Sequence, residues 1–206
     1  MKRTGLLIVV SGPSGAGKGT ICKELLSRNE NIHLSVSATT RGPRTGEVDG
    51  VNYHFIDKNL FKERIEKNAF LEYAEVYHNF YGTPSDFVME KINKGEDVLL
   101  EIDIQGALQV KKNFPEGVFV FILPPSLMEL KSRIIKRNSE TAETLNTRFS
   151  SAMSEIAQID NYNYFIINDV VDDATGRLEA IIEAEKCRVD YHIQQILQMF
   201  KEEHEC

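Results

Sequence analysis

The stretch GPSGAGKGT constrains this chain more than any other part of the sequence. It follows a short apolar run at residues 6–10 and precedes KGTICKELLSRN, which places Ile21, Cys22, Leu25 and Leu26 on one helical face. A strand, a glycine-rich turn and a helix in this order form a phosphate-binding loop, whose backbone N–H groups and lysine surround an oxyanion. The sequence therefore predicts a phosphate site made by Gly12, Pro13, Ser14, Gly15, Ala16, Gly17, Lys18, Gly19 and Thr20.

Strand and helix patterns then alternate along the chain. Residues 97–103, 118–123 and 164–169 are predicted to be further strands, since each contains an apolar run typical of a buried strand in a parallel sheet. Helical patterns follow them at residues 104–114, 126–138 and 173–200. The predicted apolar stripes are Leu127, Leu130 and Ile134 in the second helix, and Leu178, Ile181, Ile182, Val189, Ile193 and Leu197 in the last. This alternation predicts an α/β fold with a parallel sheet core flanked by helices.

Two stretches interrupt the alternation. Residues 38–83 are rich in glycine, threonine and tyrosine, and they predict an inserted, mostly β subdomain. Residues 126–158 predict a helical lid, because their central part is very polar and carries several arginines. We therefore expect one domain over residues 1–206, whose core comprises residues 1–37 and 84–206.

Composition excludes several classes of protein. The chain has a net charge of −7, whereas a protein that binds duplex nucleic acid usually has a basic excess. Its three cysteines form no C-x-x-C pair, and its five histidines show no metal-ligand spacing. The apolar runs are far shorter than the roughly 20 residues of a membrane span. These features favour a cytoplasmic protein without nucleic-acid or membrane partners, and they leave monomer and homo-oligomer open.

The phosphate loop has one unusual position. A hydroxyl normally follows the lysine and ligates Mg²⁺, but here Gly19 follows Lys18 and the hydroxyl comes at Thr20. We therefore expect Mg²⁺ to be held mainly by phosphates and water, near Thr20 and Asp103, with no direct protein ligand assigned. The order G-K-G-T resembles nucleoside monophosphate kinases more than GTPases.

Several segments together resemble guanylate kinase over essentially the whole chain. They are residues 35–55, 70–84 and 99–107, the PPS at 124–126 and YFIIND at 164–169. The resemblance implies a P-loop kinase fold in which the insertion binds GMP. It also implies the reaction ATP + GMP ⇌ ADP + GDP, with Mg²⁺ as cofactor, activity on dGMP, and a place in purine nucleotide metabolism.

The resemblance assigns GMP binding to Ser37, Arg41, Arg44, Tyr53, Glu72, Tyr81, Thr83 and Asp103. Two guanidiniums can fork onto one phosphate, and the tyrosine hydroxyls can donate to the same group. Glu72 decides the choice of base, because guanine presents N1–H and N2–H₂ as adjacent donors and a carboxylate accepts both. Adenine would instead turn a lone pair towards that carboxylate.

The predicted catalytic residues are Lys18, Arg41, Asp103, Arg137 and Arg148. The lysine and the arginines neutralise charge on the transferring phosphoryl group, and Asp103 helps to hold hydrated Mg²⁺. Arg137 also belongs to the predicted ATP site, together with the loop and Asn168. Asp169 resembles a residue near the adenine and ribose, while Glu101 and Arg133 are lesser candidates.

Two other functions remain open from the sequence. One is a kinase of another acceptor such as AMP, against which Glu72 argues. The other is a guanylate-kinase-like scaffold domain that binds peptides without catalysis, against which the complete loop argues. The sequence departs from the family pattern at two places. His78 stands where many members have glycine, beside the segment that carries Tyr81, and removes no contacting group. The lid reads KRNSETAE where many members have an Arg-Gly turn.

Overall fold

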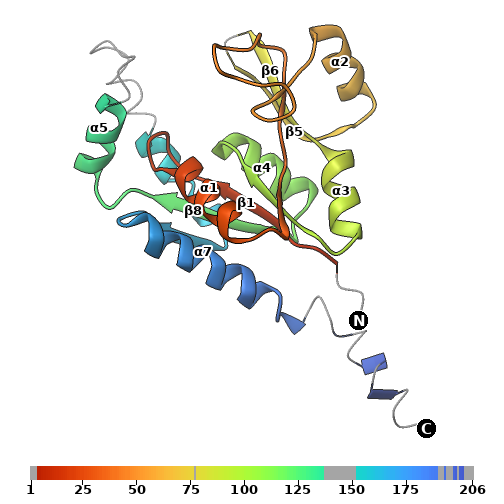
Figure 1. Cartoon of the computed structure of the whole chain (residues 1–206), viewed down its shortest axis with the longest axis vertical. Coiled ribbons are helices and arrows are strands. Elements are labelled where there is room, and N and C mark those ends of the chain that lie inside the picture. The colour runs from red at the N-terminus through yellow and green to blue at the C-terminus, as the bar shows by residue number, and fades with distance from the viewer. Residues whose placement is uncertain are drawn as a thin grey trace.

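A five-stranded parallel sheet forms the centre of the computed structural model (Figure 1), which describes residues 4–76, 78–136, 152–189, 193, 197–198 and 200–201. The strand order is β2-β7-β1-β8-β9. The strands are β1 (Leu7–Ser11), β2 (Ile32–Leu34), β7 (Asp97–Glu101), β8 (Val118–Leu123) and β9 (Tyr164–Ile167). This arrangement confirms the α/β class and the parallel sheet.

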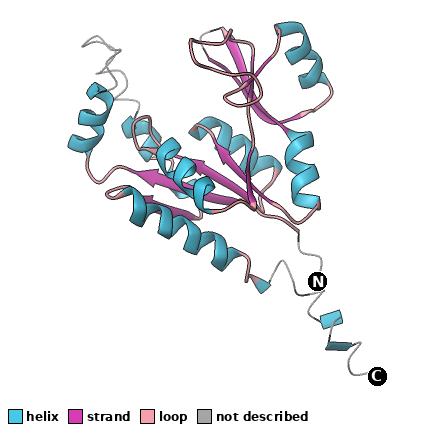
Figure 2. Ribbon diagram, viewed as in Figure 1, coloured by secondary structure: helices cyan, strands magenta, loops and turns pink. Residues whose placement is uncertain are grey.

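Helices cover both faces of this sheet (Figure 2). On one face lie α1 (Lys18–Arg28) and α7 (Val171–Glu185), which pack Ile21, Leu25, Leu178 and Ile182 against alternate residues of β1 and β8. On the other face lie α3 (Ser85–Asn93) and α4 (Ile104–Asn113). Because both faces are covered, the central strands are mainly apolar on both sides.

A second sheet stands apart from the first, beside α2 and above α3 in Figure 1. Its order is β4-β3-β6-β5, from β3 (Ala38–Thr39), β4 (His54–Phe55), β5 (Phe70–Val76) and β6 (Asn79–Pro84). Helix α2 (Lys58–Glu66) packs on it through Phe61, whose ring stacks 4.4 Å from Phe70 and 5.4 Å from Phe80. The segment predicted as mostly β thus also contains one helix.

Three sequence predictions about packing are wrong. Strand β9 lies at the edge of the sheet, so Phe165 and Ile167 are exposed although Ile166 is buried. Helix α7 ends at Glu185 and a turn follows at residues 186–187, so Val189, Ile193 and Leu197 are exposed rather than packed. In α5 (Leu127–Lys136), Leu130 and Ile134 are buried but Leu127 is exposed.

Within the described residues, no helix combines the length and apolar character needed to cross a bilayer.

The carboxyl ends of the parallel strands meet at one edge of the main sheet. The phosphate loop leaves β1 there, Ile102 and Asp103 follow β7, and Asn168 follows β9. Neighbours β7 and β8 flank β1, and the chain crosses from one side of it to the other between them. This reversal opens a crevice beyond the strand ends, where ligands of such sheets bind.

Candidate active site

The loop at residues 12–17 is folded tightly over the end of the sheet. Its glycines Gly12, Gly15 and Gly17 have φ values of 142°, 90° and 92°. A Cβ at Gly12 would lie 2.3 Å from the carbonyl oxygen of Ile122, so only glycine permits this approach to β8. The Lys18 Nζ folds back over the loop and donates to the carbonyl of Gly12 at 2.6 Å. Burial lowers the pKa of Lys18, while nearby carboxylates act in the opposite direction.

A cavity of about 190 Å³ lies against this loop. It is lined by Gly12, Ser14, Gly15, Gly17, Lys18, Gly19, Glu101, Asp103, Ile104 and Glu155. Backbone N–H groups of a glycine loop and a helix N-terminus make a site for oxyanions. The carboxyl of Glu155 faces this site, and burial raises its pKa, opposed by the backbone of Ser14 and the charge of Lys18.

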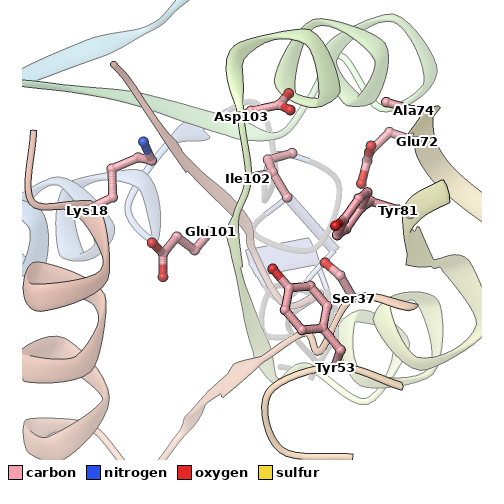
Figure 3. A pocket seen from close by; sticks show the side chains of 10 residues that line it. Lys18, Ser37, Tyr53, Glu72, Ala74, Tyr81, Glu101, Ile102 and Asp103 are labelled. Atoms are coloured by element: carbon pink, nitrogen blue, oxygen red, sulfur yellow. The ribbon is translucent and has the colours of Figure 1, made fainter. Parts of the chain in front are cut away.

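A larger cavity of about 340 Å³ lies between the two sheets (Figure 3). Its lining comprises Lys18, Ser37, Tyr53, Glu72, Ala74, Tyr81, Gly82, Glu101, Ile102 and Asp103. Lys18 and Glu101 lie on one side of the view, Glu72 and Tyr81 on the other, and Asp103 and Ile102 between them. Lys18, Glu101 and Asp103 line both cavities, so the two are adjacent and meet at this lysine.

Glu72 is a buried carboxyl at the far end of the larger cavity. The Thr83 hydroxyl donates to its Oε1 at 2.7 Å, because the pairing of β5 with β6 sets these residues opposite each other. Its Oε2 lies 2.9 Å from the position that a Cβ would take at Gly106, so a side chain there would displace it. Burial raises the pKa of Glu72 to about 7, and the charge of Asp103 adds to the effect.

Arg41 lies in a cluster of aromatic and acidic groups near the same cavity. Its guanidinium lies 5.5 Å from the centroid of the Tyr53 ring and forms an ion pair with Glu47 at 2.9 Å. The rings of Tyr53 and Tyr81 meet edge to face at 6.0 Å. The pKa of Arg41 is raised by its hydrogen bond to Glu47 and also by Tyr81. One guanidinium and two phenol groups thus gather at one end of the cavity.

Asp103 and Glu101 stand where β7 ends. Asp103 caps α4 by accepting the N–H of Gly106 at 2.8 Å. Glu101 Oε1 lies 3.1 Å from the ideal Cβ position of Gly19, so the glycine after Lys18 leaves room for this carboxylate. Among the described residues, no three potential ligating side chains are grouped closely enough to hold a metal ion. Two carboxylates beside a phosphate loop do suit a hydrated Mg²⁺ held through water.

The structure brings many of the predicted site residues together. Glu72, Tyr53, Tyr81, Ser37, Lys18 and Asp103 line one cavity, and Thr83 contacts Glu72. The Arg44 side chain is exposed and lines neither cavity, and Thr20 is also exposed. Asn168 contacts the phosphate loop rather than either cavity. Arg137 and Arg148 lie outside the described residues, as do residues 137–151 of the predicted lid as a whole.

The sequence did not indicate the roles of three residues at the site. Glu47 holds Arg41, Glu155 faces the phosphate loop, and Gly106 makes room for Glu72. Glu47 and Glu155 stand in polar segments with no distinctive spacing, so no sequence pattern marks them. Gly106 stands inside a predicted helix, where an isolated glycine is a signal of close packing.

Comparisons with known proteins agree with this geometry. A family model described as guanylate kinase matches residues 4–185. Guanylate kinase of Clostridium perfringens is 60% identical over 199 residues, which cover 97% of this chain and 92% of that protein. Guanylate kinase of Clostridioides difficile is 60% identical over 98% of each chain. The crystal structure of guanylate kinase from Anaplasma phagocytophilum superposes with a TM-score of 0.78, at 32% identity, covering 97% of this chain and 96% of that one. This chain therefore belongs to the guanylate kinase family.

Proposed function

We propose that this protein transfers the γ-phosphoryl group of ATP to GMP, giving ADP and GDP, and that it also accepts dGMP. The observation that carries the proposal is that two adjacent cavities share Lys18. One cavity is lined by backbone N–H groups suited to the phosphates of the donor. The other ends in a buried carboxyl suited to the guanine of the acceptor. A phosphoryl group passing between the two nucleotides would cross beside the Lys18 ammonium.

The acceptor site is assigned to residues of the second sheet and of the loops beside it. Glu72 accepts N1–H and N2–H₂ of guanine, and Ser37 and Thr83 support this end. At the other end, Arg41, Arg44, Tyr53 and Tyr81 bind the GMP phosphate. Glu47 pairs with the guanidinium of Arg41 at 2.9 Å and holds it beside the proposed phosphate position. Residues 38–83 are in this view the GMP-binding part of the chain.

The donor site is assigned to residues 12–20 with Asn168, and to Arg137 in the predicted lid at 126–158. Glu101 and Asp103 would hold hydrated Mg²⁺ beside the donor phosphates. When bound, the ion neutralises negative charge on the β- and γ-phosphates. Lys18, Arg41, Arg137 and Arg148 supply the remaining positive charge during transfer.

The chemistry needs no general base. The nucleophile is an oxygen of the GMP phosphate, which is already anionic near neutral pH. Catalysis then consists of bringing two anions together in line and neutralising their charge. This requirement explains why a protein of net charge −7 places lysine and arginine side chains at this site. A cytoplasmic location and a role in purine nucleotide supply remain predictions from the sequence.

The test is ADP formation by the purified protein with ATP and Mg²⁺, offering GMP, dGMP, AMP, CMP or UMP in turn. We expect rapid turnover with GMP and slower turnover with dGMP. Turnover with AMP instead would leave the donor site in place and contradict the assignment of Glu72. Absence of turnover with every acceptor, in a folded protein, would favour a binding domain without catalysis.

A further inference from the structure

Asn168 lies directly after β9, beside the phosphate loop. Its backbone N–H donates to the carbonyl of Leu123 at 2.8 Å, which extends the pairing of β9 with β8 by one bond. Its side chain is buried, and Nδ2 donates to the carbonyl oxygen of Ala16 at 2.7 Å across 152 positions of sequence. The residue that follows the edge strand thus holds the middle of the loop.

Arg133 of α5 reinforces the same contact. Its guanidinium donates to the backbone carbonyl of Asn168 at 3.1 Å and to that of Ala16 at 3.4 Å. An ion pair with Glu129 at 2.8 Å, one helical turn away, holds the arginine in position. The loop, the end of β9 and α5 are therefore joined by three hydrogen bonds that meet at Ala16 and Asn168.

The hydrogen bonds to the Ala16 carbonyl set the direction of one N–H group of the loop. The described peptide bonds include no cis form, and in a trans peptide the carbonyl of one residue and the N–H of the next point opposite ways. With the Ala16 carbonyl turned towards Asn168, the Gly17 N–H is turned away from it. Gly17 lines the cavity of the loop. A Cβ at Gly17 would lie 2.2 Å from Asn168 Nδ2, so any residue other than glycine at position 17 would clash with the Asn168 side chain.

We propose that Asn168 is a positioning residue, which aims the Gly17 N–H at the donor phosphates by holding the Ala16 carbonyl. The proposal rests on the proposed function, because it assumes that the loop binds the phosphates of ATP. It differs from a direct contact between Asn168 and the nucleoside. The Oδ1 atom of Asn168 is buried and has no hydrogen-bond partner among the described residues, so a contact with the adenine is the competing explanation.

Inorganic tripolyphosphate distinguishes the two explanations, because it presents the phosphate chain without the nucleoside. We would measure the binding of ATP and of tripolyphosphate by calorimetry, for the wild type and for Asn168→Ala. Loss of one hydrogen bond should weaken the binding of both ligands by the same factor, between about twofold and tenfold. Weaker ATP binding with unchanged tripolyphosphate binding would overturn the proposal in favour of a nucleoside contact. Unchanged binding of both ligands would also overturn it.

Asn163 supplies a matched control at the other end of β9. Its Oδ1 accepts the N–H of Phe119 at 2.9 Å, so Asn163→Ala removes a similar bond far from the loop. We expect Asn163→Ala to bind both ligands as the wild type does. Equally weakened ligand binding in Asn163→Ala and Asn168→Ala would show a general loss of structure and contradict a positioning role.

Asn168→Leu keeps the approximate size of the side chain, removes the donor and adds no charge, so it decides the matter if the alanine variant does not fold. Because leucine cannot donate to the Ala16 carbonyl, this variant should bind tripolyphosphate and ATP more weakly than the wild type by the same factor. Unchanged binding of tripolyphosphate by this variant would overturn the proposal. Both binding tests are independent of GMP turnover, so failure of the proposed function would appear separately in the wild type.

Discussion

Replacing Glu72 by glutamine should make the unliganded protein more stable at alkaline pH while impairing its use of GMP. In the wild type, burial raises the pKa of this carboxyl from 4.5 to about 7. The folded protein therefore binds a proton more tightly at Glu72 than the unfolded chain does. The favourable contribution of this proton is fully present below the unfolded pKa of 4.5, and it is lost as pH rises through 7. Glutamine carries no charge and removes this dependence.

The magnitude follows from the shift in pKa. Raising the pKa from 4.5 to about 7 corresponds to about 3 kcal/mol, at about 1.36 kcal/mol for each pKa unit, and this is an upper bound because the structure relaxes around a buried charge. The free energy of unfolding of Glu72→Gln should thus equal that of the wild type near pH 4.5 and exceed it by up to about 3 kcal/mol at pH 8. Urea unfolding followed by circular dichroism, at both pH values and without ligand, measures the difference.

The same substitution should also weaken the binding of GMP. It replaces one carboxylate oxygen by an NH₂ group, which opposes a donor of guanine instead of accepting from it. Loss of a charge-assisted hydrogen bond costs about 1.5–3 kcal/mol, or roughly a 10- to 150-fold increase in KM for GMP. Glu75→Gln is the control, because Glu75 lies on the same strand with an exposed side chain. If Glu72→Gln were less stable than wild type at pH 8, or kept its KM for GMP, this reasoning would be refuted.

Three further substitutions test the charges at the site. Lys18→Met should lower kcat by about 10²-fold or more without unfolding the protein, since it removes the cation shared by both cavities; single-turnover kinetics would show it. Arg41→Lys should raise KM for GMP about tenfold and leave KM for ATP unchanged, because lysine cannot fork onto a phosphate; equal change in both constants would argue against the assignment. Glu155→Gln should tighten ATP binding about threefold in calorimetry, since it removes a like charge from the cavity of the loop; weaker binding would show that this carboxyl assists the nucleotide.

The parts of the fold that were predictable are those encoded by neighbouring residues. Strand β8 begins and ends at the predicted residues, and the phosphate loop lies between a buried strand and a helix as expected. The wrong predictions have one origin, which is that an apolar pattern does not show where its segment lies in the fold. The apolar pattern of residues 164–169 matches that of a central strand, but its position at the sheet edge leaves Phe165 exposed. The pattern beyond Glu185 continues the helical period, yet a turn at residues 186–187 interrupts it.

At the candidate site, too, the sequence indicated individual residues and the structure alone showed their contacts. Resemblance to a family supplied Glu72 and Arg41, but nothing in the sequence paired them with their neighbours. Glu72 meets Thr83 through the register of β5 and β6, and Arg41 meets Glu47 across a turn of the loop. Likewise, Asn168 reaches Ala16 only because β9 lies beside β8 in the sheet.

The sequence by itself thus determined the phosphate loop, the alternation of strands and helices, and the family. The tertiary structure decided which side chains share a cavity, which carboxyl is buried with a raised pKa, and which residue anchors the loop. The physical reason is the range of the interactions. Backbone preference and hydrophobic periodicity act over a few neighbouring residues and can be read along the chain. Burial and side-chain contacts depend on strand order and helix packing, which only the folded chain establishes.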